Sequence, residues 1–504
     1  MTDFMELYKQ KVNTAKTFTD NGAVAYATSG KALTDFNFQV TALRHQNEKI
    51  IAQEMLSALF EDPSLFITYL FFLRDIREGM GERKIFRVVL KHLTMIYPDL
   101  MIQYIPYIGE FGRYDDLLVL LDLKASQKAV LTYFDKTLRS DLIHMEENKP
   151  VTLLAKWLPS INTSSQKQVQ YARMIAKFMG MNEQEYRQTL SRLRKYLDVV
   201  EVKMCANNWQ KINYENLTSF NQLKYNDSFM KHDAQRRKAY LDSLAEGKAK
   251  INASVLSPVD IVRKYSKDSY FSYYVKEKNE ELELLWKNLK NMQLSNTLVV
   301  RDGSGSMIGT PLTVATALAV YCSERNTGYF KDQFITFSSR PEYVDLSKCN
   351  SLYEKLKYCY TFDDYTITDL ARTMILILST AIDHHLSQED MPERILIISD
   401  MQFDGYGFNL NQSLMDKIKE QFELYGYKLP KMIFWNVNEN LSNTIPMQEN
   451  ELGLCLVSSY SADILKMVMS DHLDPYEILK ERIMSDRYQT IREIAEHYFN
   501  KGTD

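Results

Sequence analysis

The chain has 504 residues and a formal net charge of -4, with 45% hydrophobic and 25% charged residues. This length exceeds what one hydrophobic core usually organises, so we expect two or three domains, and the composition excludes long disordered tracts. Because the charge is nearly balanced, binding to nucleic acid or to a membrane would need a local basic patch.

The first half of the chain shows the spacing of amphipathic helices. Over residues 48–200, apolar residues recur three and four positions apart, and the predicted helices are 48–60, 63–76, 82–97 and 115–123. The charged turn at 74–83 lacks the ending of a phosphate loop, so we interpret it as a helix–helix corner with internal ion pairs. Short helices in quick succession favour a helical solenoid, and an irregular bundle is the alternative, since no sequence period is legible.

The pattern changes near residue 295, where strands and helices begin to alternate. Predicted strands are 295–302, 332–338, 342–346, 394–400 and 431–437, and predicted helices are 310–325 and 368–385. This order predicts an open, mostly parallel sheet with helices on both faces and ligands at the carboxyl ends of the strands. The charged stretch 276–289 predicts a solvated helix that joins the two halves.

The strongest chemical signal is Asp302-Gly303-Ser304-Gly305-Ser306, between a predicted strand and a predicted helix. The alternating Asp and Ser side chains can turn three oxygens toward one point, and the two glycines permit a tight backbone path. Mg²⁺ prefers oxygen ligands of this kind, with Mn²⁺ or Ca²⁺ as alternatives. A turn that only caps the next helix is the structural alternative, but capping does not call for three alternating oxygens.

Two further loops should reach the same edge of the sheet, at 366–369 and 399–404. Asp400 would add a second carboxylate and Thr368 another hydroxyl, with Thr366 as the alternative threonine. Two negative charges would leave the ion able to bind a carboxylate or phosphate oxygen of a ligand. The predicted metal ligands are therefore Asp302, Ser304, Ser306, Thr368 and Asp400.

This set of residues resembles the metal-ion-dependent adhesion site (MIDAS) of von Willebrand factor A domains, in which a DxSxS motif, a threonine loop and an aspartate loop hold the metal. Further segments, among them 20–38, 71–90, 105–121, 185–214, 229–251 and 398–404, are similar to the family called domain of unknown function 2828, which pairs a helical region with such a domain. That architecture resembles the Ro autoantigen, whose TROVE domain is a ring of helical repeats that binds small noncoding and misfolded RNAs.

The resemblance implies three segments. Residues 1–290 would form a mainly α-helical, HEAT- or TROVE-like region, and residues 291–472 a Rossmann-like α/β von Willebrand factor A domain with a mostly parallel sheet. Residues 473–504 would form a C-terminal helical extension.

Local charge supports an RNA-binding interpretation of the helical region. Residues 187–250 contain 13 Lys or Arg against 7 Asp or Glu, with aromatic residues interspersed. The predicted RNA-binding residues form two clusters, with a solvated surface as the alternative. They are Arg187, Arg192, Arg194 and Lys195 on one helix, and Arg236, Arg237 and Lys238 on another.

The five cysteines are odd in number and widely spread, which favours reduced thiols and a cytoplasmic location. The amino terminus has no apolar signal core, and the apolar run 65–73 is too short to span a bilayer, so we expect no membrane association.

No paired nucleophile and base or nucleotide fingerprint is visible, so we do not expect an enzyme. The predicted function is that of a non-catalytic binding protein of Ro-like architecture, which engages RNA or a ribonucleoprotein through its helical region and an acidic ligand through Mg²⁺. One alternative is a protein-interaction scaffold whose metal captures a partner carboxylate. A remote alternative is a metal-dependent hydrolase or nuclease, with Asp404 beside the metal.

Overall fold

The computed structural model describes residues 16–18, 24–26, 28–251, 253, 256–269, 272–291, 293–337, 340–362, 369–401, 414–437, 454–458 and 475–500. The chain forms two compact units, each built from two chain segments. Unit 1 comprises residues 1–61 and 253–482, and unit 2 comprises residues 62–252 and 483–504. This division does not follow the predicted segments 1–290, 291–472 and 473–504, because the first helices of the chain pack with the sheet and the last helix packs with the helical region.

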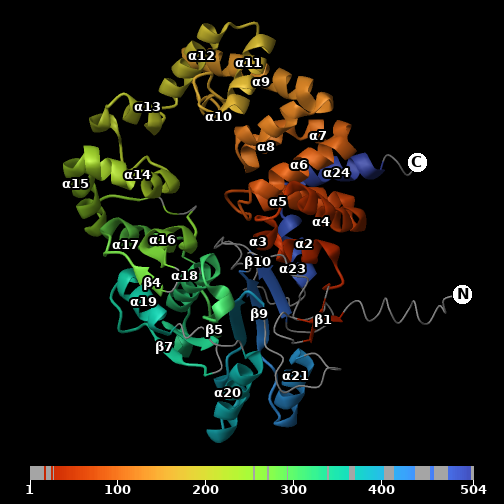
Figure 1. Ribbon diagram of the computed structural model, residues 1–504, viewed down its shortest axis with the longest axis vertical. Coiled ribbons are helices and arrows are strands. Elements are labelled where there is room, and N and C mark those ends of the chain that lie inside the picture. The colour runs from red at the N-terminus through yellow and green to blue at the C-terminus, as the bar shows by residue number, and fades with distance from the viewer. Residues whose placement is uncertain are drawn as a thin grey trace, which may run out of the picture. The chain divides into compact units, whose positions relative to one another are not determined.

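Unit 2 is helical in all of its described secondary structure (Figure 1). Its α-helices are α5 (Pro63–Arg74), α6 (Lys84–Ile96), α7 (Pro98–Gln103), α8 (Ile105–Phe111), α9 (Lys124–Glu146), α10 (Leu154–Trp157), α11 (Gln166–Phe178), α12 (Glu183–Tyr196), α13 (Val200–Cys205), α14 (Ser219–His232), α15 (Ala234–Ala245) and α24 (Gln489–Asn500). Its 3-10 helices are η1 (Tyr114–Asp122), η2 (Trp209–Lys211) and η8 (Asp486–Tyr488).

Local sequence signals set the helix boundaries in unit 2. Helix α5 begins after Asp62, whose side chain accepts a hydrogen bond from the backbone N–H of Leu65 at 2.8 Å. The predicted helices 63–76 and 82–97 are confirmed as α5 and α6. The prediction of an α-helix at 115–123 is wrong, because η1 is a 3-10 helix. Its buried leucines recur every three residues, at 117 and 120 and at 118 and 121, which suits the 3-10 period.

Unit 1 contains a six-stranded sheet in the order β10-β9-β8-β5-β6-β7. All neighbouring pairs are parallel except β6 and β7, which are antiparallel at the edge. The strands are β5 (Thr297–Asp302), β6 (Gln333–Phe337), β7 (Tyr343–Asp345), β8 (Arg394–Ser399), β9 (Lys431–Asn436) and β10 (Leu454–Ser458). The five predicted strands are confirmed, and β10 is a strand that the sequence pattern did not predict.

The remaining elements of unit 1 surround this sheet. Its α-helices are α2 (Ala32–Phe38), α3 (Val40–Leu43), α4 (Glu48–Glu61), α16 (Pro258–Tyr265), α17 (Glu280–Lys287), α18 (Thr310–Arg325), α19 (Leu352–Cys359), α20 (Leu370–Asp383), α21 (Leu414–Leu424) and α23 (Pro475–Ile483), of which α23 ends at the boundary with unit 2. Short elements are the hairpins β1 (Lys16–Phe18) with β2 (Val24–Tyr26) and β3 (Ser266–Ser269) with β4 (Ser272–Val275), and the 3-10 helices η3 (Gly305–Met307), η4 (Gly328–Phe330), η5 (Tyr360–Phe362) and η6 (Gln388–Asp390).

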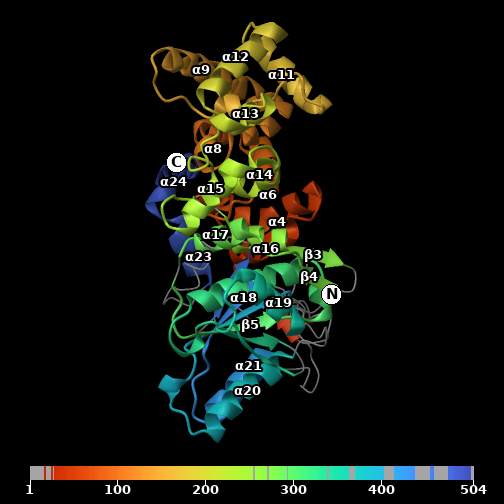
Figure 2. The ribbon, with the colours of Figure 1, turned by 90° about the vertical axis from the view of Figure 1, so that its left-hand side faces the viewer.

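Helices cover both faces of the sheet (Figures 1 and 2). Helix α18 packs on β5, β6 and β8 and is buried from Pro311 to Ser323. The opposite face forms a core in which Val300, Ile397 and Phe434 pack with apolar residues of α2, α20 and α21. Continuous apolar strands suit a parallel sheet that is buried on both sides. The predicted α/β region is therefore confirmed at the level of a mixed sheet between helices.

The charged stretch 276–289 is not the solvated connecting helix that the sequence predicted. Helix α17 is buried from Glu281 to Trp286. Glu283 accepts hydrogen bonds from the backbone N–H groups of Leu352 and Tyr353 at 2.8 and 3.0 Å, and from the hydroxyl of Tyr265 at 2.7 Å. A carboxylate can be buried when donors surround it in this way, so α17 belongs to the core of unit 1.

None of the helices among the described residues has the length and apolar character needed to cross a membrane.

Candidate metal centre

The candidate metal centre lies at the point where the strand order of the sheet reverses, between β5 and β8. From β5 the chain proceeds to β6 on one side, and it later returns to β8 on the other side of β5. Strands β5 and β8 are parallel, with Arg301 opposite Ile398, so Asp302 and Ser399 end adjacent strands at the same edge. Ligands of open α/β sheets bind at this kind of switch point, beyond the carboxyl ends of the strands.

Asp302 is fully buried and holds the first loop in place. One of its carboxylate oxygens accepts a hydrogen bond from the backbone N–H of Ser304 at 2.9 Å, and the other accepts one from the hydroxyl of Ser399 at 2.5 Å. The hydroxyls of Ser304 and Ser306 lie 3.1 Å apart. Because Ser304 is buried and Ser306 is exposed, the cluster of oxygens extends from the sheet edge to solvent.

Two buried carboxyl groups share this edge. Asp400 follows Ser399 directly and is 4% exposed. Burial, and after it the charge of Asp400, raises the pKa of Asp302 from 3.8 to about 7. Among the described residues, no Lys or Arg forms an ion pair with Asp302. The electrostatics therefore favour either a proton or a metal cation at this position.

The backbone is constrained on both sides of the site. Met401 has a φ of 67°, a conformation that residues with a side chain rarely adopt, and its N–H donates to the hydroxyl of Ser399 at 3.0 Å. Gly309, just before α18, has a φ of 106°. Gly303 and Gly305 are not among the residues with positive φ, so the left-handed turn falls after the DxSxS motif and not within it.

Of the five predicted metal ligands, four are described. Asp302, Ser304 and Ser306 are brought together by direct hydrogen bonds, and Asp400 interacts electrostatically with Asp302. The fifth, Thr368, lies outside the described residues, as do the alternative Thr366 and the neighbouring Asp404. The described residues hold no group of three His, Cys, Asp or Glu with metal-ligand geometry, which leaves this mixed set of carboxylates and hydroxyls as the candidate.

The sequence analysis did not single out Ser399, whose side chain the structure adds to the candidate site. Its hydroxyl donates to Asp302 and accepts from Met401, so it connects the first loop to the third. The signal was its position near the end of a predicted strand, directly before Asp400. Arg301 precedes the motif but serves the opposite face of the strand, where it is buried and donates to the hydroxyl of Thr316 at 2.9 Å.

The predicted RNA-binding residues of unit 2 divide into two groups. Arg187, Arg192, Lys195, Arg236 and Lys238 are exposed, although Arg192 lies 3.5 Å from the carboxylate of Glu146. The assignment of Arg237 to an RNA surface is wrong, because its side chain is fully buried and donates to Gln222 at 2.7 Å.

Two of the predicted arginines, the partly buried Arg194 and the exposed Arg236, bond to backbone carbonyls of neighbouring segments. The guanidinium of Arg194 donates to the backbone carbonyls of Ala155 and Leu158 at 2.8 and 2.7 Å. That of Arg236 donates to the carbonyl of Ile212 at 2.7 Å and pairs with Asp233 at 2.9 Å. A count of charges along the sequence does not distinguish such arginines from a free basic surface.

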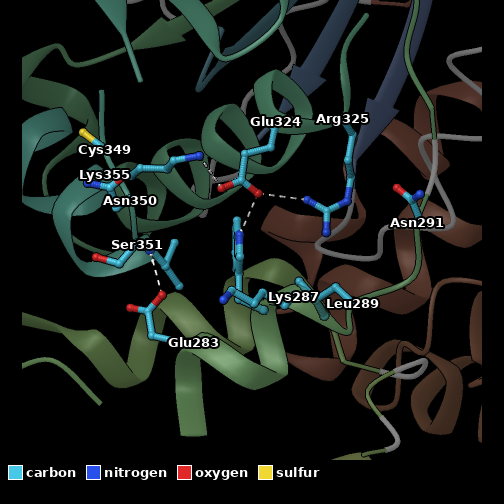
Figure 3. Close-up of a pocket in the computed structure, with 12 residues that line it drawn as sticks. Glu283, Lys287, Leu289, Asn291, Glu324, Arg325, Cys349, Asn350, Ser351 and Lys355 are labelled. Carbon is cyan, nitrogen blue, oxygen red and sulfur yellow. Dashed lines mark hydrogen bonds and ion pairs between the residues drawn. The ribbon is translucent and has the colours of Figure 1, made fainter. Parts of the chain in front are cut away.

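A separate polar cavity of about 420 Å³ lies in unit 1 between α17, α18 and α19 (Figure 3). Glu324 is its centre: it accepts hydrogen bonds from the indole N–H of Trp286 at 2.7 Å, from Lys355 at 2.8 Å and from Arg325 at 3.2 Å. Because Glu324 on α18 is paired with donors from α17 and α19, we assign this network a structural role in joining the three helices.

Comparisons with known proteins find two segments of the chain that match families without an assigned function. Residues 124–298 match the family described as Domain of unknown function (DUF2828), and residues 296–497 match Domain of unknown function (DUF7788). The predicted similarity to the first family is thus confirmed for residues 124–298, while the sheet matches a second family that the sequence analysis did not name. An uncharacterized protein of Acanthamoeba polyphaga mimivirus is 28% identical over 501 residues, which covers 92% of this chain and 86% of the viral protein.

Proposed function

We propose that the chain is a non-catalytic binding protein, whose unit 1 is a von Willebrand factor A-like domain with a metal-ion-dependent adhesion site. The metal ligands would be Asp302, Ser304, Ser306, Thr368 and Asp400, and the ion would be Mg²⁺, with an open position for an acidic group of a ligand. The strand order supports this fold. Numbered within the sheet from β5 onward, the order is 3-2-1-4-5-6, a doubly wound order with its ligand edge between strands 1 and 4.

The observation that carries the proposal is the pair of buried carboxyl groups at the switch point. A carboxylate withdrawn from water is unfavourable unless a cation or several donors compensate its charge. Asp302 accepts hydrogen bonds from Ser304 and Ser399 but has no basic side chain as a partner among the described residues, and Asp400 is close enough to raise its pKa. A divalent ion would compensate both charges, and the exposed Ser306 would leave it accessible to a ligand.

The test is metal-dependent stability of the whole protein. Thermal unfolding in Mg²⁺ or Mn²⁺, compared with unfolding in EDTA, should show stabilisation of wild type, because an ion that binds only the folded state raises its stability. Asp302→Asn should abolish this stabilisation. The matched control Glu389→Gln removes an exposed carboxylate of the same unit and should keep it. Equal metal responses in wild type and Asp302→Asn would overturn the proposal.

The kind of ligand that the ion binds distinguishes a protein-interaction scaffold from a metal-dependent hydrolase. In the protein-scaffold form, a partner carboxylate completes the coordination of the ion, so a partner captured in Mg²⁺ is released by EDTA and lost in Asp302→Asn. Turnover of a phosphodiester or ester that depends on the ion would instead establish the hydrolase alternative.

Binding of RNA by unit 2 is a second candidate, favoured by the exposed Arg187, Arg192 and Lys195 on α12. Changing all three to Glu should weaken retention of RNA and reduce the dependence of affinity on salt, since fewer phosphate contacts release fewer counterions. The matched control changes the exposed Lys124, Lys128 and Lys136 of α9 to Glu. If both triple variants behave alike, α12 has no specific role in RNA binding.

A further inference from the structure

Unit 2 contains a cavity of about 920 Å³ that the metal proposal does not use. It lies between the loop after α8 and helices α10, α12, α13 and α14, which are labelled in Figure 1. Its volume falls in the upper part of the range of small-molecule sites, roughly 300–1,000 Å³.

Four cations and one carboxylate line this cavity: Arg113, Lys156, Arg194, Lys224 and Glu201. Arg113 pairs with Asp115 at 2.5 Å, but in the described part of the chain the other three cations form no ion pair with a carboxylate. Arg194 is held by backbone carbonyls alone, and burial lowers its pKa. The cavity thus carries an excess of positive charge, which an anionic ligand would balance.

Aromatic surface is available beside these charges. Phe220, on α14, is 60% exposed although its ring is apolar. Trp157 is half-buried, with the guanidinium of Arg113 stacked 3.9 Å from its ring centre and the ammonium of Lys156 at 5.3 Å. Planar rings of this kind bind a flat ligand by stacking, so the cavity offers both an anion-binding and a ring-binding surface.

Glu201 adds a hydrogen-bond acceptor to the cations and aromatic rings of the cavity. One of its carboxylate oxygens accepts a hydrogen bond from the hydroxyl of Tyr225 at 2.8 Å, and the other is buried without any partner. A buried acceptor without a donor is costly, and a ligand toward which the Glu201 side chain turns to accept a hydrogen bond would remove the cost.

We propose that this cavity binds a nucleotide with an exocyclic amino group. Its phosphate would lie at the cations Lys156 and Lys224, its base would stack on the aromatic rings, and its amino group would donate to Glu201. This ligand would reach the cavity either as a free nucleotide or as one nucleotide of a single-stranded RNA. The inference does not depend on RNA binding at α12, because the lysines and rings of the cavity belong to other elements.

Calorimetric titration of the full-length protein with AMP, adenosine and inorganic phosphate tests the proposal. AMP should bind at least about tenfold more tightly than either fragment, because only AMP engages both surfaces. Inosine monophosphate has a carbonyl in place of the amino group and should also bind about tenfold more weakly, since this leaves Glu201 without its donor.

Variants separate a specific site from general attraction between charges. Lys156→Gln and Lys224→Gln should each weaken AMP binding by about tenfold. Lys128→Gln removes an exposed cation of α9 outside the cavity and should change it by less than about twofold. Bound AMP should also protect Cys205, an exposed residue of the cavity lining, from alkylation. Absence of AMP binding, equal losses in all three variants, or unprotected Cys205 would overturn the proposal.

A labelled oligoadenylate distinguishes the two sources of the nucleotide. If the oligonucleotide binds and AMP displaces it, the cavity takes a nucleotide of an RNA strand. If AMP binds and the oligonucleotide does not, the ligand is a free nucleotide and the proposal of RNA binding fails by itself. If the oligonucleotide binds without competition from AMP and without an effect of Lys156→Gln, RNA binds elsewhere and the cavity takes only a free nucleotide.

Discussion

Asp302 combines complete burial with a charge that nothing basic among the described residues neutralises. Hydrogen bonds from Ser304 and Ser399 favour the ionised carboxylate, whereas burial and the neighbouring Asp400 disfavour it. The second pair of effects is larger, because the pKa rises to about 7. In the absence of a metal, the ionised form of this residue therefore opposes folding at neutral pH.

This conflict predicts how stability depends on pH in EDTA. The folded protein holds the proton of Asp302 more tightly than the unfolded chain between pH 3.8 and about 7, so its contribution to stability is full below this range and is lost as the pH rises through it. Asp302→Asn should therefore raise the melting temperature at pH 8, with a gain that decreases toward pH 4. Differential scanning fluorimetry across this range measures the effect.

Asp345 provides a control of opposite sign for this measurement. Hydrogen bonds from Ser347 lower its pKa, so its stabilising contribution is present above its ordinary pKa and is lost in acid. Asp345→Asn should lower the melting temperature slightly at pH 8. A lower melting temperature of Asp302→Asn at pH 8 would contradict the interpretation of Asp302 as a destabilising buried charge.

Single residues show what the sequence could and could not predict about the site. Asp302, Ser304 and Ser306 were predictable because their chemistry and spacing lie within one short motif. Ser399 was not, because its role depends on the pairing of β5 with β8, which joins residues 97 positions apart. Arg237 was assigned to a surface because charge along a sequence does not report burial, and its partners include the amide of Gln222.

At the scale of elements, Asp116 fastens η1 to α5 and α6. One of its carboxylate oxygens accepts from the side chain of Arg74 at 2.7 Å, and the other accepts from that of Arg87 at 2.6 Å. The backbone N–H of Arg113 donates to the same carboxylate at 3.0 Å. The sequence predicted ion pairs internal to the corner at 74–83, whereas Arg74 of this corner pairs with Asp116 on η1.

Removal of Asp116 should therefore destabilise the protein strongly. Asp116→Ala leaves Arg74, which is 2% exposed, as a buried charge without its carboxylate, and breaking such a pair costs about 3–5 kcal/mol. Urea unfolding monitored by helical circular dichroism measures this loss. Asp135→Ala breaks a pair with Arg139 on the surface of α9 and should cost less than about 1 kcal/mol. Similar losses in the free energy of unfolding of both variants would mean that the ion pairs of Asp116 contribute no more than a surface pair.

Elements with a continuous apolar pattern were predicted correctly, whereas an element with a charged pattern was not. Strands β5, β8 and β9 are runs of apolar residues beside turn signals, and they were predicted within two residues of their ends. Helix α17 was misjudged because its glutamates indicate a solvated face, whereas Glu283 is buried among backbone donors from α19. Those donors become neighbours only through the tertiary fold.

At the scale of the whole molecule, each unit depends on chain segments that are far apart. In unit 1, the side-chain amide of Asn436 on β9 donates a hydrogen bond to the backbone carbonyl of Phe38 at 3.2 Å, which joins α2 to the sheet. In unit 2, Arg487 pairs with the buried Asp75, and the hydroxyl of Tyr104 donates to the carbonyl of Ile491 at 2.9 Å. Each unit therefore combines segments from distant parts of the chain, so its boundaries cannot be read as one continuous stretch of sequence.

Because each unit has its own core, perturbations of one unit should act on its own unfolding transition. In scanning calorimetry, Mg²⁺ should raise the transition of unit 1 alone, and Asp302→Asn should remove that rise. Arg487→Ala deprives the buried Asp75 of its cation, so it should lower the transition of unit 2 and leave the response to Mg²⁺ intact. The double variant should show both effects additively, as expected for sites without shared partners. A single transition that responds to Mg²⁺ and to Arg487→Ala alike would show instead that the two units unfold as one cooperative body.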